Sequence, residues 1–480
     1  MPKKKLPNII LIVLDTARAK SFSCYGYHRK TTPNIDRIAE EGVLYRWCFA
    51  PSNWTLPCHA SLFTGLYPVN HGCNAYSLYL YENIPALPEI LQNTGYNTVG
   101  ISCNGLVSEP MGFRRGFNVF KECWGLGFSN FFLKGETRKE RVKELIDLLR
   151  GGKFRALGRW FATRFLKNRL SVITNSVPYT RKALGVVKKV LKELLGHSSG
   201  PLFLFINLMG THAVYNPPHP FRGTWSSRRM THQKALGEIK AYPDYYDFYA
   251  RPELQGKVNW AEITNFYDEE LCFVDSVIGH IFEMVESAGF KQSTFFVITS
   301  DHGEMLGEHG LYGHIWGLYN EVIHIPMIIS FPEFGFGRIV ENPVQLHDLF
   351  ATILEIADIP YPTPKDSISL CSSEKRTVAM SQDVDSEMDL VHIMGRNPDL
   401  SLTSPWASRS CAVVDEALIK AIATPSGYRE LYDLRSDYLE EKNLGYNRKA
   451  ETTGLLLCDG LFAPEGQNRK IPEQERVGDI

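Results

Sequence analysis

The sequence has no long apolar run, no paired cysteine motif and no excess of either charge, and each absence excludes a class of protein. No stretch approaches the ~18 consecutive apolar residues of a membrane-spanning helix. The ten cysteines are scattered without Cys-x-x-Cys spacing, so neither a disulfide framework nor a structural zinc site is expected, and a reducing compartment is indicated. Because 52 lysines and arginines are balanced by 53 aspartates and glutamates, the overall charge gives no reason to expect nucleic-acid binding.

The N-terminus begins with a basic and then an apolar segment, an order that imitates a short signal peptide. Residues 3–5 are lysines, and residues 9–14 are apolar. The apolar run is brief, ends on Asp15 and has no small-residue cleavage site behind it. It is better interpreted as a buried parallel strand with a functional carboxylate at its carboxyl end, and we expect a cytoplasmic protein.

Short β-branched runs alternate with helical patterns along most of the chain. This alternation is typical of βαβ units, so we predict an α/β fold with a mixed, mostly parallel sheet flanked by helices. Asp15, His212 and Asp301 each follow one of these strands, at the edge where open α/β sheets bind ligands. The expected strands are 9–14, 97–102, 202–208, 295–299 and 326–330, and the expected helices include 35–41 and about 265–288.

Two regions differ from this pattern. Residues 121–196 are helical in pattern and strongly basic, and are expected to be an insertion into a catalytic domain of residues 7–360. Within the insertion, the arginines and aromatic residues of 153–170 fit either a peripheral membrane or anionic-substrate contact, or a helical cap with a solvated basic face, which we favour. A smaller α+β subdomain is expected at 375–450 after a Pro- and Ser-rich linker, and the polar tail 459–480 is expected to be disordered.

Residues 54–65 carry the strongest functional signal. They read Trp-Thr-Leu-Pro-Cys-His-Ala-Ser-Leu-Phe-Thr-Gly. This window resembles the nucleophile signature of the sulfatase family, in the alkaline-phosphatase superfamily, where Cys or Ser-x-Pro-x-Arg precedes Leu-x-Thr-Gly. The alignment places Thr55 at the nucleophile position and His59 at the arginine position, so the resemblance is to a subgroup with threonine as nucleophile.

The threonine bears on the cofactor that the resemblance implies. Classical sulfatases oxidise their cysteine to formylglycine, and because a threonine cannot be oxidised in this way, no formylglycine is expected. Cys58 lies three residues beyond Thr55 and lacks the Pro and Arg at the required offsets. We interpret it as a small, partly buried thiol near a helix start.

Three further blocks and a closing motif extend the resemblance over about residues 7–450. The block Pro-Asn-Ile-Ile-Leu-Ile-Val-Leu-Asp makes Asp15 a metal ligand by analogy, although a threonine follows where sulfatases usually have a second aspartate. The block Ser-Asp-His-Gly-Glu gives Asp301 and His302 as further ligands. The segment Glu-Leu-Tyr-Asp-Leu at 430–434 resembles the closing motif of the C-terminal subdomain.

The remaining candidates are assigned to the substrate by the same resemblance. His212 corresponds to a family histidine that touches substrate or leaving group, and His314 stands where sulfatases carry a lysine that holds the ester oxygens. Asn104 replaces a Gly-Lys-Trp-His motif, which removes two sulfate-binding groups, and Asn104 and Arg18 are predicted to bind substrate. His28, His71, His219 and His309 are expected to be surface or structural residues.

The predicted ligands Asp15, Asp301, His302 and the Thr55 oxygen form an oxygen and nitrogen set without a thiolate. Such a set suits a divalent metal (Mn²⁺, Zn²⁺, Mg²⁺ or Ca²⁺), which acts as a Lewis acid on a tetrahedral anion and eases deprotonation of a bound hydroxyl. We favour one metal. A second metal is left open, with His212, His314 and Asp268 or Asp275 as its candidate ligands.

Three functions remain to be distinguished. The first is a metal-dependent hydrolase in which Thr55 attacks a sulfate or phosphate ester, with phosphodiesters or phosphonates favoured, because a phosphoryl-threonine can be hydrolysed at phosphorus. The second is a phosphoglycerol-type transferase that acts near a membrane through 153–170. The third is a catalytically inactive binding module. The substrate is expected to be a small-molecule, lipid or sugar ester, and nothing in the sequence indicates an oligomeric state.

Overall fold

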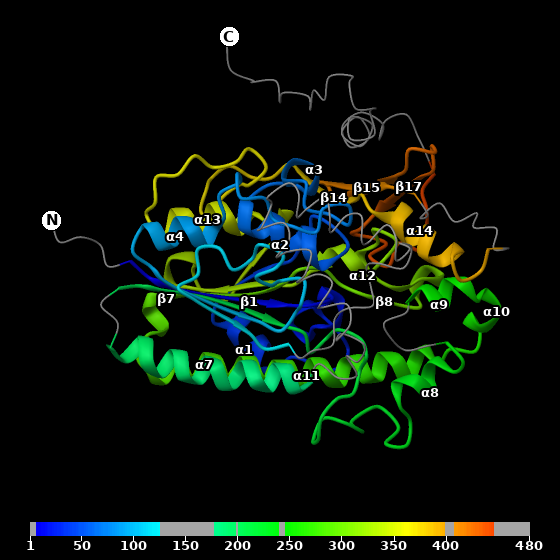
Figure 1. Cartoon of the computed structure of the whole chain (residues 1–480), viewed down its shortest axis with the longest axis horizontal. Coiled ribbons are helices and arrows are strands. Elements are labelled where there is room, and N and C mark those ends of the chain that lie inside the picture. Colours follow the sequence, from blue (N-terminus) through cyan, green and yellow to red (C-terminus); the bar gives the residue numbers. More distant parts are fainter. Residues whose placement is uncertain (1–5, 125–176, 198–199, 240–244, 399–407, 446–480) are drawn as a thin grey trace, which may run out of the picture.

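A central eight-stranded sheet forms the core of the molecule in the computed structural model (Figure 1), which describes residues 6–124, 177–197, 200–239, 245–398 and 408–445. Its strand order is β12-β2-β11-β7-β1-β6-β4-β5. The bounds are β1 Asn8–Leu14, β2 Val43–Tyr45, β4 Asn97–Ser102, β5 Val119–Glu122, β6 Leu202–Leu208, β7 Thr294–Ser300, β11 Met327–Ser330 and β12 Arg338–Val340.

The predicted mixed, mostly parallel α/β sheet is confirmed. Strand β1 lies between β6 and β7 and pairs with both in parallel, and β4 and β5 continue the parallel arrangement on the β6 side. Strand β11 runs antiparallel to β7 and β2. Every residue of β6 and β7 is buried, because helices cover both faces of the sheet, and this explains the continuous apolar runs in the sequence.

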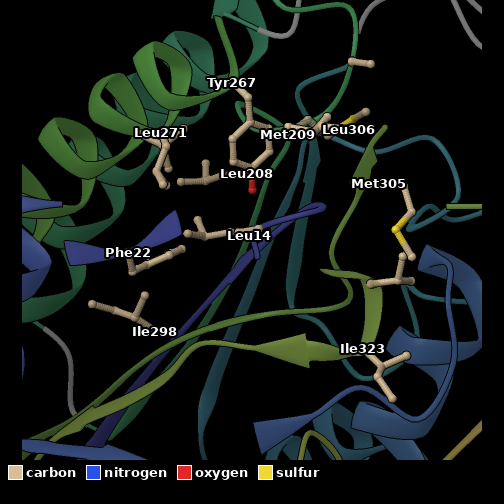
Figure 2. Close-up of a cluster of buried hydrophobic side chains, with 14 of the residues drawn as sticks. Leu14, Phe22, Leu208, Met209, Tyr267, Leu271, Ile298, Met305, Leu306 and Ile323 are labelled. Carbon is tan, nitrogen blue, oxygen red and sulfur yellow. The ribbon is translucent and has the colours of Figure 1, made fainter. Parts of the chain in front are cut away.

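Two layers of helices enclose the sheet (Figure 1). One face is covered by α1 (Pro33–Glu40), α7 (Val177–His197) and α11 (Trp260–Ser287), and the other by α2 (Thr55–Thr64), α4 (Leu87–Asn93) and α13 (Asp348–Ile356). In Figure 2, Leu271 and Tyr267 of α11 lie beside Leu14 and Leu208, the last residues of two central strands. The helix expected at about 265–288 begins earlier, because the Asn259 side chain accepts a hydrogen bond from the Glu262 amide and caps it.

Helix α7 falls in the second half of the segment expected to be an insertion. It packs against β4, β6 and α11, so this part of the chain belongs to the helical layer that covers the sheet. The segment 153–170 and the tail 459–480 lie outside the described residues. In the parts of the chain that the structure describes, no helix has the length and apolar character needed to cross a membrane.

A separate antiparallel sheet follows the central sheet in the sequence. Its strands are β14 (Val378–Asp383), β15 (Ser410–Asp415), β16 (Ile419–Ala423) and β17 (Arg429–Asp433), and α14 (Ser386–Met394) follows β14. The remaining elements are α3 Pro68–His71, α8 His232–Leu236, α9 Tyr245–Ala250, α10 Pro252–Gln255, α12 Asn320–Ile323, β3 Cys48–Phe49, β8 Met305–Leu306, β9 Tyr312–Gly313, β10 His324–Ile325 and β13 Val344–Gln345.

Candidate active site

The carboxyl ends of the central strands bring together side chains from distant parts of the sequence. Leu14, the last residue of β1, pairs with Ser300 of β7 and Leu208 of β6. The next residues, Asp15 and Asp301, remain tied to the same edge, because the Asp15 amide donates to the Leu208 carbonyl at 2.8 Å and the Asp301 amide to the Leu14 carbonyl at 3.3 Å. Two carboxylates separated by most of the chain therefore become neighbours.

Asp15, Asp301 and His302 form a buried cluster whose ligand atoms all lie within 4.8 Å of one another. His302 Nε2 is 3.5 Å from Asp301 Oδ2 and 4.0 Å from Asp15 Oδ1, and all three side chains are fully buried. Among the described residues, Asp15 Oδ1 and Asp301 Oδ2 have no hydrogen-bond partner.

A bound cation would stabilise the buried carboxylates of this cluster. Burial and the neighbouring Asp15 raise the pKa of the Asp301 carboxyl well above its usual value, while burial and the neighbouring His314 lower the pKa of His302. Two buried carboxylates with unpartnered oxygens are costly unless a positive charge joins them. The donor set, two carboxylates and a neutral imidazole, therefore fits a divalent metal ion.

Thr55 is the first residue of α2 and lies directly beside this cluster. Its Oγ1 is 3.3 Å from His302 Nε2, and Asn104 Nδ2 lies 3.4 Å away. The same Asn104 amide donates to Asp15 Oδ2 at 2.5 Å, so Asn104 links the hydroxyl to a predicted metal ligand. The first turn of α2 presents the positive end of the helix dipole to the hydroxyl, which favours developing negative charge there.

Cys58 occupies a different environment from Thr55, although both lie on α2. It is fully buried, and its thiol donates to the Ser52 carbonyl at 3.2 Å. Burial raises the pKa of the Cys58 thiol well above its usual value, so the thiolate is disfavoured. These properties are those of an inert structural cysteine.

His59 lies behind Thr55 and does not reach the surface of the site. It is fully buried, its Nδ1 donates to the Thr55 carbonyl at 3.0 Å, and its ring meets Phe113 and Phe205 edge-on. Burial lowers the pKa of His59 to about 4, so the ring is neutral at physiological pH. The expected contact between His59 and substrate oxygens is not made in this arrangement, because the side chain packs into the core beneath Asp301, 3.5 Å from its Oδ2.

His212 and His314 lie on the open side of the cluster. The centroids of their rings are 5.3 Å apart, and the His314 ring is 4.6 Å from that of His302. His212 Nδ1 donates to the Ala213 carbonyl at 2.6 Å. Burial and the neighbouring His212 lower the pKa of His314 to about 3, so His314 is a neutral imidazole.

Glu304 is a residue of the site that the sequence reasoning passed over. It is fully buried, its Oε1 lies 3.0 Å from His314 Nδ1, and Tyr215 donates to its Oε2 at 3.3 Å. Burial raises the pKa of Glu304 to about 8. The signal was present, because Glu304 stands two residues after His302 in the same motif, but nothing in the spacing connects it with His314.

Arg18 lies beside Glu304 but is not among the residues that line the cleft. Its guanidinium donates to Glu308 Oε1 at 2.9 Å and to Ser21 Oγ at 3.1 Å, and it stacks over the Tyr267 ring at 4.8 Å. These contacts occupy the side chain, which is 2% exposed, so its predicted contact with substrate stays a prediction.

The candidate ligands of a second metal on α11 are likewise engaged elsewhere. Asp268 Oδ2 accepts hydrogen bonds from Tyr27 and Arg29. Asp275 accepts from Asn34 and from the Ile35 amide at the start of α1, where it acts as a helix cap. Neither carboxylate joins the cluster of Asp15, so the described residues offer a single three-ligand group.

Thr55 lines a cleft beside the cluster. Its lining includes Thr55, Asn104, His212 and His314. Further lining residues come from α9 and from the C-terminal segment after residue 360, which the sequence did not connect with the site. These residues include Tyr245, Tyr246, Asp383, Asp385, Met388, Asp389 and His392.

Comparison with known proteins agrees with this geometry. The sequence profile of the family described as Sulfatase matches residues 7–359. The chain is 25% identical over 409 residues to the N-acetylglucosamine-6-O-sulfatase of Bacteroides thetaiotaomicron, covering 76% of this chain and 70% of that protein. It is 26% identical over 422 residues to human arylsulfatase D, covering 76% and 68%.

Solved structures share the fold at low sequence identity. The phosphonate monoester hydrolase of Agrobacterium radiobacter superposes with a TM-score of 0.63 at 20% identity, covering 95% of each chain. A protein solved with its substrate D-glucosamine-2-N,6-O-disulfate superposes with a TM-score of 0.62 at 19% identity, covering 95% of this chain and 97% of the other.

Proposed function

Because the chain belongs to the sulfatase family of ester hydrolases, we propose that it cleaves its ester through attack by the Thr55 hydroxyl. The observation that carries this proposal is the position of Thr55 Oγ1, which lies 3.3 Å from His302 and 3.4 Å from Asn104, beside the buried carboxylate and histidine cluster and in the lining of the cleft. The hydroxyl is thus both anchored and accessible from the cleft, as a nucleophile must be.

Asp15, Asp301 and His302 would hold a divalent cation, which when bound supplies Lewis-acid neutralisation of the ester oxygens. Asn104 fixes Thr55 relative to Asp15 through one amide group that reaches both oxygens. His212 and His314 border the cleft, His212 as a candidate to protonate the departing oxygen and the neutral His314 as a candidate to donate a hydrogen bond to the ester oxygens.

The threonine favours phosphodiesters or phosphonates over sulfate esters. A phosphoryl-threonine can be resolved by attack of water at phosphorus, whereas classical sulfatases release sulfate by collapse of a formylglycine hydrate. The structural likeness to a phosphonate monoester hydrolase is compatible with this preference. The preference for phosphorus therefore rests on the chemistry of Thr55.

The test compares Thr55→Ala, Thr55→Ser and Cys58→Ser with the unchanged protein. p-Nitrophenyl sulfate, p-nitrophenyl phosphate, bis(p-nitrophenyl) phosphate and p-nitrophenyl phenylphosphonate are assayed with Mn²⁺, Zn²⁺, Mg²⁺ and Ca²⁺. We expect Thr55→Ala to lower kcat by about 10³-fold or more, Thr55→Ser to keep part of the activity, and Cys58→Ser to keep nearly all of it.

Circular dichroism and thermal melting check that each variant is folded. Acid quenching during turnover, followed by peptide mass spectrometry, is expected to find a phosphoryl group on the Thr55 peptide. If Thr55→Ala retained full turnover while Cys58→Ser lost it, the nucleophile would have to be reassigned.

A further inference from the structure

Two cysteines, Cys103 and Cys123, follow neighbouring parallel strands of the central sheet. Strands β4 and β5 pair as far as Ser102 and Glu122, so the next residue of each strand is a cysteine. The Cys123 amide continues this pairing, because it donates to the Ser102 carbonyl at 2.7 Å. Adjacent strands lie about 4.8 Å apart, and the Cα atoms of a disulfide lie about 4.4–6.8 Å apart, so the backbone spacing here suits a disulfide.

Both thiols lie on the same face of the sheet and meet each other. Cys103 is fully buried and Cys123 is 1% exposed, and both belong to the apolar core that includes Ala183 and Val187 of α7. Both cysteines are free, and the Cys103 thiol donates a hydrogen bond to the Cys123 sulfur. The parallel pairing of β4 and β5 thus brings together two thiols whose spacing in the sequence gave no sign of a pair.

The surroundings make the two thiols chemically unequal. Burial raises the pKa of the Cys103 thiol well above its usual value. The pKa of the Cys123 thiol is lowered, because Cys103 donates to it and because Lys182 and Lys121 lie nearby. Lys182 reaches the end of β5 directly, with its Nζ 3.4 Å from the Glu122 carbonyl oxygen. Cys123 is therefore suited to react first with an oxidant, and Cys103 is placed to attack the product.

Cys103 directly precedes Asn104, the residue that joins Thr55 to Asp15. The Asn104 side-chain amide lies 3.4 Å from Thr55 Oγ1 and donates to Asp15 Oδ2 at 2.5 Å. The Ser102 hydroxyl fixes the backbone of Asn104, because it accepts from the Asn104 amide at 3.2 Å and donates to the Asn104 carbonyl at 3.0 Å. A shift of the chain at Cys103 is therefore passed on to a side chain that contacts the proposed nucleophile.

We propose that Cys103 and Cys123 are a redox pair, in which hydrogen peroxide produces a disulfide that displaces Asn104 and slows turnover at Thr55. The disulfide goes beyond the proposed function, whereas its effect on turnover rests on that function. An S–S bond is about 2.05 Å long, so the two sulfurs must approach more closely than two thiols in contact. The end of β4 moves with Cys103, and Asn104 is the next residue.

Hydrogen peroxide is the only oxidant that the reaction needs. The Cys123 thiolate attacks one peroxide oxygen, the O–O bond breaks, and the departing hydroxide takes up the former thiol proton as water, which leaves a sulfenic acid. The Cys103 sulfur attacks the sulfenic sulfur, the S–O bond breaks, and the departing hydroxide leaves as water with the Cys103 proton. Two thiols are oxidised and one peroxide is reduced to two waters. Because β5 is an outer strand whose residues are exposed or half-buried, solvent lies close to Cys123.

The first experiment detects the bond itself in the full chain. The reduced protein is treated with hydrogen peroxide, free thiols are blocked with iodoacetamide, and the peptides are analysed by mass spectrometry without reduction. We expect a disulfide-linked pair of peptides that contains Cys103 and Cys123. In Cys103→Ser, dimedone should label the sulfenic acid that remains on Cys123. The exposed Cys371 provides the control, because Cys371→Ser should form the same link as the wild type.

The second experiment measures the effect on the site. For an ester that the reduced protein hydrolyses, we expect oxidation to lower kcat by about tenfold or more, because a displacement of about 1 Å can have an effect of this size, and dithiothreitol should restore kcat. Cys123→Ser should keep its kcat in peroxide, whereas Cys371→Ser should lose activity as the wild type does. Cys123→Ala replaces Cys123→Ser if thermal melting shows that the serine variant is unfolded.

The outcomes separate the two proposals. Absence of the link between Cys103 and Cys123, or full turnover by the linked protein, overturns the inference and leaves the proposed function standing. If the reduced protein hydrolyses no ester, the proposed function fails, and the rise in melting temperature that Mn²⁺ produces decides the inference. A smaller rise in the linked protein supports the displacement of Asn104, which holds Asp15, and an equal rise overturns it.

Discussion

The contact between Glu304 and His314 fixes the orientation of the His314 side chain on the cleft wall. Glu304 is buried and meets His314 Nδ1 at 3.0 Å, while Tyr215 fixes its other oxygen at 3.3 Å. An imidazole held through Nδ1 keeps a constant orientation, with Nε2 left for other contacts. Glu304 is thus a positioning residue that acts through His314.

We therefore expect Glu304→Gln to lower kcat by about 10- to 100-fold with little change in KM. If His314 donates a hydrogen bond to the departing oxygen, the loss will be larger for alkyl esters than for p-nitrophenyl esters, whose leaving group is already a stable anion. Steady-state kinetics with both ester types measures this difference, and thermal melting checks the fold. Equal losses for both ester types would show that Glu304 is merely structural.

His71 provides a second prediction for a single residue, on stability. It is 1% exposed, its Nε2 lies 3.0 Å from Ser61 Oγ, and its Nδ1 accepts from the Cys73 amide. Burial lowers the pKa of His71 from 6.5 to about 3, so between these values the unfolded chain binds a proton that the folded chain does not. This residue therefore contributes stability that is present above pH 6.5 and is lost as the pH falls.

The prediction compares the free energy of unfolding of the wild type with that of His71→Gln. Below pH 6, the wild-type value should fall relative to the value of the variant by about 1.4 kcal/mol for each pH unit. Urea denaturation of both proteins at pH 7.5, 6.0 and 5.0 measures it. A difference that stays constant over this range would contradict the assignment of a neutral, buried His71.

At the scale of single residues, the sequence indicated which residues form the cluster, but it did not indicate in which direction the side chains around the cluster point. Asp15 and Asp301 directly follow strands, so the sheet edge alone brings them together. The direction of a side chain away from a strand end depends on partners that spacing does not reveal. Arg18 turns to Glu308 across the fold, and His59 turns into the core beneath Thr55.

Among the elements, the turn after β7 depends on a glycine at position 303. A Cβ there would lie 2.0 Å from the Glu321 carbonyl oxygen, and the Gly303 amide donates to the Val322 carbonyl at 2.6 Å. The close approach of these two backbone segments sets the position of His302 relative to Asp301. Only glycine permits it without moving α12.

We expect Gly303→Ala to lower the free energy of unfolding by about 3 kcal/mol and to weaken metal-dependent stabilisation, because His302 must shift. Gly185→Ala is the matched control: it lies exposed on α7 with nothing near its Cβ position, and a gain of up to about 1 kcal/mol is expected. Chemical denaturation with and without Mn²⁺ measures both effects. Equal behaviour of the two variants would contradict the proposed constraint.

The strands of the sheet were predictable because each is a continuous apolar run buried on both faces, as in β6 and β7. Helix α7 was harder to assign, since its many lysines suggested an insertion. One side of the helix, including Ala183 and Val187, is nevertheless fully buried against the sheet. Charge composition averages over both faces of a helix and therefore concealed the buried one.

Across the whole molecule, a buried ion pair ties the C-terminal sheet to the catalytic core. Lys420 of β16 is fully buried, with its Nζ 2.6 Å from Glu440 Oε1 and 3.1 Å from Asn320 Oδ1 of α12. Glu440 also accepts from the Asn320 amide at 2.6 Å. Removal of one partner leaves the other charge buried and uncompensated.

Lys420→Met should therefore cost about 3–5 kcal/mol of unfolding free energy, whereas Lys442→Met at an exposed position should change it by less than about 0.5 kcal/mol. Guanidinium denaturation followed by tryptophan fluorescence compares the two. A loss below about 1 kcal/mol for Lys420→Met would show that the two sheets are joined mainly by other contacts.

The pairing of β1 with β7 also has a consequence for how the protein is made. Asp15 is translated well before its partners Asp301 and His302, and the cleft residues within 383–389 follow later still. A nascent chain that ends before residue 301 therefore lacks two of the three side chains of the cluster. Chains arrested before residue 302 cannot bind metal at this cluster, so metal uptake would report that translation has passed this point.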